Sequence, residues 1–92
     1  MKFEWDAQKA ASNLRKHGVA FTEAVTVFAD PLARIHDDPD HPAQEEREIL
    51  VGQSARGQLL LVFFTERGDV TRIFSARRPT KLERNDYEEG IP

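Results

Sequence analysis

A run of basic residues near the C-terminal end carries the clearest chemical signal in the sequence. Positions 67–84 hold six basic residues and two acids, namely Arg67, Arg72, Arg77, Arg78, Lys81 and Arg84 against Asp69 and Glu83. A planar guanidinium group binds two phosphate oxygens through paired hydrogen bonds. The run therefore predicts a phosphate-binding surface. The alternative is a solvated charged rim in which Glu66, Glu83 and Glu88 pair with the arginines.

The position of this run matters because the whole protein is acidic. The 92 residues have a formal net charge of −3, and residues 21–50 hold eight acids against two basic residues. Where acidic and basic residues are segregated along a chain, a binding partner meets the local charge rather than the net charge. We therefore expect two opposed patches, with the positive one in the last third of the chain.

Two further side chains are able to carry protons or contact a base. His17 follows Arg15 and Lys16, and a histidine ordinarily titrates near neutrality, which suits general acid and base catalysis of RNA cleavage. The alternative role for His17 is a cation that complements the C-terminal end of a helix. Tyr87 could stack on a base or transfer a proton, and its alternative role is partly buried packing.

A metal site has little support in the sequence. The segment 36–41 offers imidazole and carboxylate groups, but its prolines prevent regular structure, and aspartates in such turns usually bond their own backbone. The chain has no cysteine, which excludes a disulfide scaffold and a thiolate zinc site. Neither a nucleophilic serine elbow nor a glycine-rich phosphate loop is present. We expect no metal and no cofactor.

Length and composition predict one small domain that spans residues 1–92. Apolar residues make up 39% of the chain, which is enough for a packed core. Apolar stretches fall well short of the roughly 18–20 residues that cross a membrane, and the first residues do not resemble a signal peptide. We therefore expect a cytoplasmic protein without membrane contact.

The pattern of apolar and turn residues predicts a strand, two helices, further strands and a last helix. Asp6 and Gly18 mark the ends of the first helix, Thr22 is the predicted N-cap of the second, and Thr80 with Glu83 forms a capping box for the last. The predicted strands cover Lys2 to Trp5, Leu32 to Ile35, Arg47 to Gln53, Gln58 to Thr65 and Val70 to Ala76. This order predicts an α+β domain with an antiparallel sheet of about four strands, two N-terminal helices and one C-terminal helix. We expect the helices on one sheet face, which leaves the other face free for function.

Hairpin geometry decides which arginines share that free face. A two-residue turn at Gly68 and Asp69 places Arg67 opposite Val70 and Thr65 opposite Arg72. Strict alternation then puts Arg67, Arg72 and Arg78 on one side of the sheet and Arg77 on the other. In either register, arginines at the ends of neighbouring strands are expected to converge within a few ångströms.

An ordered set of short motifs resembles the BrnT family of type II toxins. The resemblance extends over almost the whole chain, and its motifs are Phe3-Glu4-Trp5-Asp6, Asn13 to Ala24, Phe28-Ala29-Asp30-Pro31, Asp37 to His41, Glu45-Glu46-Arg47, Thr65-Glu66-Arg67, Arg72 to Arg78, Glu83-Arg84 and Tyr87-Glu88. Each motif alone says little, whereas their order is specific.

The resemblance implies a RelE-like fold and a metal-independent endoribonuclease that inhibits translation and growth. It implies a partner, a BrnA-type antitoxin with a ribbon-helix-helix DNA-binding fold, through which alone the toxin reaches operator DNA. In such toxins basic side chains hold the phosphate while the 2′-hydroxyl of the RNA attacks. The alternative is a non-catalytic binding module that acts as a corepressor with its antitoxin.

Site residues follow from the same resemblance, position by position. Arg67, Arg77, Arg78 and Tyr87 are the main catalytic candidates, and one arginine would stabilise the charge of the phosphorane. The proton carriers would come from His17, Glu66 and Tyr87. Arg47, Arg72 and Lys81 are expected to contact RNA.

Overall fold

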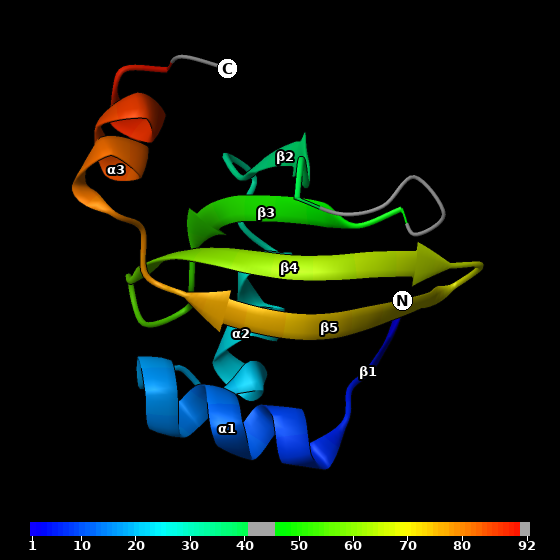
Figure 1. Ribbon diagram of the computed structural model, residues 1–92. Coiled ribbons are helices and arrows are strands. Elements are labelled where there is room, and N and C mark those ends of the chain that lie inside the picture. Colours follow the sequence, from blue (N-terminus) through cyan, green and yellow to red (C-terminus); the bar gives the residue numbers. More distant parts are fainter. Residues whose placement is uncertain (41–45, 91–92) are drawn as a thin grey trace.

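A five-stranded sheet forms the centre of the computed structural model, which describes residues 1–40 and 46–90 (Figure 1). Three helices accompany the sheet. The elements in chain order are β1 (Lys2–Glu4), α1 (Ala7–His17), α2 (Phe21–Val27), β2 (Arg34–Asp37), β3 (Glu48–Gln53), β4 (Leu59–Arg67), β5 (Val70–Arg77) and α3 (Lys81–Glu88).

Helix α1 begins and ends at the predicted residues. The Asp6 carboxylate accepts hydrogen bonds from the backbone amides of Gln8 and Lys9 at 2.8 and 3.0 Å, and these bonds, that from Lys9 first, lower the pKa of Asp6. Gly18 ends the helix with a φ of 68°, a left-handed conformation that glycine adopts without strain. The capping box of α3 is also present, with Thr80 and Glu83 bonding each other's backbone amides.

Helix α2 begins one residue before its predicted N-cap. The predicted cap, Thr22, is exposed, whereas the helix starts at Phe21 and its N-cap position is Ala20, with no side-chain hydrogen bond to the described residues. Burial explains the difference, because Phe21, Ala24 and Val27 lie on one helix face in the core. Burying that face outweighs the gain from a threonine cap.

The sheet is mixed rather than wholly antiparallel, and it has five strands where about four were expected. Its order is β1-β5-β4-β3-β2, and β1 runs parallel to β5 while the other three pairs are antiparallel. The first strand thus pairs with the last one. Strand spacing along the chain gave no indication of this long-range pairing.

Alternate residues of β4 face two different layers. Leu60, Val62 and Phe64 belong to the main core under α1 and α2. Leu59, Leu61 and Phe63 face the opposite side, which we call the open face, where Tyr87 of α3 packs against them. In Figure 1, α2 lies behind the strands and α3 stands beside one end of the sheet. The expectation that every helix covers the same face is therefore wrong for α3.

Helix α1 lies along the edge of β5 beyond the end of β1. The buried side chain of Asn13 donates to the carbonyls of Ala76 and Val19 at 2.8 and 2.9 Å and accepts from the amide of Ala76 at 3.1 Å. Asn13 thereby pairs backbone groups of β5 that β1 is too short to reach. This contact fixes α1 against the sheet.

Candidate functional site

The arginine run is divided between the two sides of the sheet by a β-bulge. The predicted hairpin register is confirmed, with Arg67 opposite Val70 and Thr65 opposite Arg72. One step further, however, Phe64 pairs with Ile73 and Phe63 with Ser75, so that Phe74 is an extra residue. The bulge reverses the alternation beyond it.

The expected partition and convergence of the arginines are therefore wrong. Arg77, not Arg78, shares the open face with Arg72, because Arg77 lies opposite Leu61. Arg67 lies opposite Val70 at the hairpin end, six residues along β4 from Leu61, a separation of roughly 20 Å at the rise of a strand. The arginines line a sheet from end to end rather than form one cluster.

The remaining predicted residues of this run have separate surroundings. The Nη1 of Arg72 donates to Glu4 at 2.6 Å, and the Nε of Arg78 donates to Gln58 at 2.9 Å. Glu66 is exposed in the hairpin, and Lys81 is exposed on α3. The structure does not bring them together with one another.

A hollow of about 310 Å³ lies between α1 and β5. We call it the basic groove, and it is lined by Lys9, Ser12, Asn13, Lys16, His17, Arg47, Phe74 and Ser75. The predicted residues His17 and Arg47 thus lie in one hollow. Among the described residues that line it, none is acidic, and the charged side chains of the lining are cations.

The sequence reasoning missed Lys9 and Lys16. Their signal is helical periodicity, since the lining residues of α1 lie three, four, seven and eight positions after Lys9 and so share one helix face. The density of charge along the chain does not reveal a stripe of cations on one helix face.

Phe74 is the aromatic centre of the basic groove. The guanidinium carbon of Arg47 lies 3.8 Å from the ring centroid, and the Nζ of Lys9 lies 5.4 Å from it. Arg47 precedes β3, so its side chain extends across β4 to reach the bulge of β5. Cation–π contacts thus join the start of β3 to α1 through the extra residue of the bulge.

At the other end of the open face, Arg77 is held by an acid from α3. Its Nη1 and Nη2 donate to the two oxygens of Glu83 at 2.8 and 3.0 Å, and the amide of Thr80 also donates to Glu83 at 2.8 Å. The bonds from Arg77 lower the pKa of Glu83 to about 2, and the same pair raises the pKa of Arg77. The Arg77 guanidinium also lies 5.5 Å from the ring centroid of Phe63.

A second hollow, which we call the α3 pocket, opens beside this ion pair. Its volume is about 290 Å³, and it is lined by Arg34, His36, Asp37, Pro39, Ile49, Val51, Leu61, Glu83, Asp86 and Tyr87. The predicted residue Tyr87 lies here, with Arg34 5.3 Å from its ring centroid and its hydroxyl 3.4 Å from the carbonyl oxygen of Leu32. Sequence reasoning missed Arg34, because no nearby basic residue marks it.

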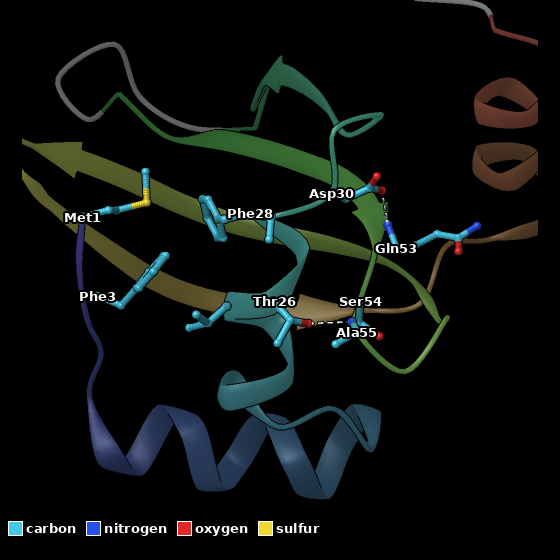
Figure 2. A pocket seen from close by; sticks show the side chains of 10 residues that line it. Met1, Phe3, Thr26, Phe28, Asp30, Gln53, Ser54 and Ala55 are labelled. Atoms are coloured by element: carbon cyan, nitrogen blue, oxygen red, sulfur yellow. Dashed lines mark hydrogen bonds between the residues drawn. The ribbon is translucent and has the colours of Figure 1, made fainter.

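A third hollow lies away from all predicted site residues. It measures about 700 Å³ on the helix side of the sheet, where Figure 2 shows Phe3 and Phe28 beside Met1. Two of its polar side chains bond to backbone amides, as Asp30 accepts from the amide of Gln53 at 2.7 Å and Thr26 accepts from the amide of Ala55 at 2.8 Å (Figure 2). This hollow offers packing surface rather than chemistry.

The loop that the sequence offered for a metal lies only partly within the described residues. His41 is outside them, and within residues 1–40 and 46–90 no group of three or more metal-binding side chains comes together. In the same part of the chain, no helix is long and apolar enough to span a membrane.

The fold and its open face define a small α+β protein that presents positive charge beside an aromatic sheet surface. A family model described as the ribonuclease toxin BrnT of type II toxin-antitoxin systems matches residues 5–83, and the chain belongs to this family. The 1.1 Å crystal structure of the Brucella abortus ribonuclease toxin BrnT has the same fold. Its TM-score is 0.66 at 23% sequence identity, and the match covers 88% of this chain and 99% of that one. No curated protein sequence matches.

Proposed function

We propose that the protein is a metal-independent endoribonuclease that binds and cleaves RNA on its open face, and thereby inhibits translation and growth. Membership of a ribonuclease toxin family supports the general activity. The observation that carries the proposal is the basic groove, in which Lys9, Lys16, His17 and Arg47 surround an aromatic ring. Phosphate and base are the two groups that such a surface suits.

The chemistry we assign to the groove needs only the RNA and side chains of this chain. The 2′-hydroxyl of a ribose attacks the adjacent phosphate, and the 5′-oxygen of the next nucleotide leaves, which gives a 2′,3′-cyclic phosphate and a 5′-hydroxyl. His17 carries protons in this reaction. Lys16 and Arg47 stabilise the additional negative charge of the phosphorane. The charged side chains that line the basic groove are cations rather than the carboxylates that bind metal ions, so the groove suits a phosphate.

Arg77 and Tyr87 serve the same RNA strand from the α3 side in this proposal. Arg77 meets the strand with a guanidinium that Glu83 holds over Phe63. Arg67, Arg72 and Lys81 remain predictions as peripheral RNA contacts, and Arg78 and Glu66 remain predictions as catalytic groups. The fit to RelE-like ribonucleases is part of the proposal.

The partner we propose is an antitoxin of the BrnA type with a ribbon-helix-helix fold. Family membership implies an antitoxin, and an antitoxin neutralises this toxin most directly by covering the open face. Operator DNA would then be bound by the antitoxin alone, because the acidic net charge of this chain opposes direct binding to DNA.

The decisive experiment incubates the purified protein with RNA in EDTA. We expect cleavage with cyclic phosphate ends, and RNA that stays intact with and without added Mg²⁺ would instead indicate a non-catalytic corepressor. Cleavage that requires Mg²⁺ would contradict metal independence.

The adjacent residues Arg77 and Arg78 provide a matched pair of variants. The bulge places only Arg77 on the open face, so we expect Arg77→Ala to relieve growth arrest more than Arg78→Ala. Circular dichroism of both variants shows whether they fold. A folded Arg77→Ala variant with full toxicity would remove Arg77 from the site.

A further inference from the structure

The α3 pocket has features that the proposed cleavage chemistry does not use. Its floor is apolar and consists of Ile49 and Val51 from β3 with Leu61 from β4, of which Leu61 is only 3% exposed. Tyr87 stands at its side and packs against the same apolar cluster. A floor of this kind accepts a flat ring and offers nothing to a phosphate.

The inner face of α3 adds carboxylates to this apolar floor. Glu83, Asp86 and Tyr87 are spaced three and four positions apart, so they share the helix face that lines the pocket. Both oxygens of Glu83 are engaged by Arg77. Asp86 has no hydrogen bond or ion pair with any other residue in the part of the chain that the structure describes, so its carboxylate is available to a ligand.

Arg34, His36, Asp37 and Pro39 complete the lining, and the Arg34 guanidinium lies 5.3 Å from the Tyr87 ring centroid. On the α3 side, the Asp86 carboxylate beside the apolar floor selects a ring with hydrogen-bond donors. Guanine carries two neighbouring donors, N1–H and the N2 amino group, and a carboxylate accepts both at once. Adenine and cytosine place an acceptor nitrogen beside their amino group, and uracil has a single N–H between two carbonyls. Each of these three bases presents an acceptor to the negative charge, which weakens binding.

The geometry points to a guanine-binding subsite in the α3 pocket, with Asp86 as the residue that selects the base. This inference rests on the proposed ribonuclease function, and it supplies the sequence preference of that reaction. The pocket adjoins Glu83, which binds the Arg77 guanidinium near the Phe63 ring. On the open face, Phe63 lies between Ile49 of the pocket and Ser75 of the basic groove, its partners on β3 and β5. One RNA strand then places guanine in the pocket and a nearby phosphate in the groove.

Binding is tested with mononucleotides, independently of cleavage. Guanosine 5′-monophosphate is titrated into the ¹⁵N-labelled protein, in parallel with the adenosine, cytidine and uridine monophosphates. We expect guanosine monophosphate to shift the amide signals of Ile49, Val51 and Tyr87 and to bind about tenfold more tightly than the others. Inosine monophosphate, which lacks the N2 amino group, is expected to bind with intermediate affinity.

Two variants with the same charge change locate the preference. Asp86→Asn is expected to remove the preference for guanine, whereas Asp69→Asn, in the hairpin at the far end of β5, is expected to retain it. Equal affinity for all four nucleotides, or an unchanged preference in Asp86→Asn, would overturn the inference. So would loss of antitoxin binding in Asp86→Asn with nucleotide binding unaltered, because the pocket would then serve a protein partner.

Mapping of cleavage sites separates this inference from the function on which it rests. RNA that is cut at a fixed distance from guanine supports both. Cleavage without any preference for guanine, in a protein that binds no mononucleotide in the pocket, would overturn the subsite and leave the ribonuclease function intact. Guanine binding without cleavage of any RNA would retain the subsite and overturn the proposed function.

Discussion

The two ends of the open face differ in how their charges are balanced. In the basic groove, cations from α1 and Arg47 surround Phe74, and no acid lies among the described lining residues. Beside the α3 pocket, Glu83 neutralises Arg77, and the lining of the pocket itself holds three acids, Asp37, Glu83 and Asp86, together with Arg34. The groove therefore attracts phosphate, while the pocket suits a neutral base with hydrogen-bond donors.

The two ends also differ in how their helices are attached. Asn13 is 5% exposed and joins α1 to β5 through two hydrogen bonds with Ala76, while a third reaches the carbonyl of Val19. No residue of α3 is buried, and its contacts with the sheet are made by Glu83 and Tyr87. We infer that the groove is the fixed end of the open face and the pocket is the adjustable end.

The largest effect is expected when Asn13, which attaches α1 at the fixed end, is substituted. Asn13→Ala leaves the backbone groups of Val19 and Ala76 without a buried partner, and we expect a loss of about 3 kcal/mol in the free energy of unfolding. Urea denaturation measures it, with Ser12→Ala, one position earlier on α1, as the control. Equal midpoints for the two variants would show that Asn13 does not anchor α1.

Each end of the open face has a histidine in its lining, and the two are expected to differ in their chemistry. His17 lies in the basic groove and His36 in the α3 pocket. Loss of a proton carrier typically costs about a hundredfold in rate, so His17→Ala is expected to lower kcat by about that factor, and His36→Ala far less. Single-turnover cleavage of a short RNA gives both values. The reverse order would place the chemistry at the α3 end.

Salt dependence measures phosphate contact in the groove. Each phosphate contact to a single strand contributes about 0.7 to the slope of log affinity against log salt, so Lys16→Ala is expected to reduce that slope by about 0.7. Arg56, whose side chain is 75% exposed beside Glu23 of α2, provides the control substitution Arg56→Ala. An unchanged slope in Lys16→Ala would mean that Lys16 does not contact a phosphate.

The smallest expected effect concerns the adjustable end and depends on pH. Glu83 ordinarily titrates near 4.5, whereas Arg77 lowers its folded-state pKa to about 2. The stability from this pair is therefore fully present above pH 4.5 and is lost as the pH falls toward 2. Because the two side chains are 31% and 35% exposed, solvent screening limits the contribution to about 1 kcal/mol or less.

Amide signals of α3, followed by NMR between pH 5 and 2, should show the helix leaving the sheet before the core unfolds. In Glu83→Gln the same signals are expected to lose this transition, while Glu88→Gln, which alters the weak 3.7 Å pair with Arg84, should retain it. Simultaneous loss of α3 and the core would contradict the adjustable attachment.

Local patterns in the sequence predicted most of the elements of this fold. Asp6, Gly18 and the capping box of Thr80 and Glu83 predicted helix ends correctly, because capping depends on residues that are neighbours in the chain. The parallel pairing of β1 with β5 was missed, because it joins residues that are nearly seventy positions apart. The family was also identified from the order of its motifs.

The candidate site was predicted only in part, and the bulge is the main reason. The hairpin register was correct, but one extra residue at Phe74 exchanged Arg77 and Arg78 between the two sides of the sheet. The cationic stripe on α1 and the pairing of Arg77 with Glu83 depend on how the helices pack against the sheet. Counting charges along the chain does not reveal this packing. The roles of all these residues remain predictions.

The bonds from Asn13 also have a consequence for association between molecules. An unpaired strand edge is a template on which another chain adds a strand, a common route to aggregation. β1 pairs with β5 only as far as Arg72, and Asn13 occupies the backbone groups of Ala76 further along the same edge. Helix α1 thus covers this part of the β5 edge, and a variant that releases α1 should expose it to strand addition as well as lose its groove.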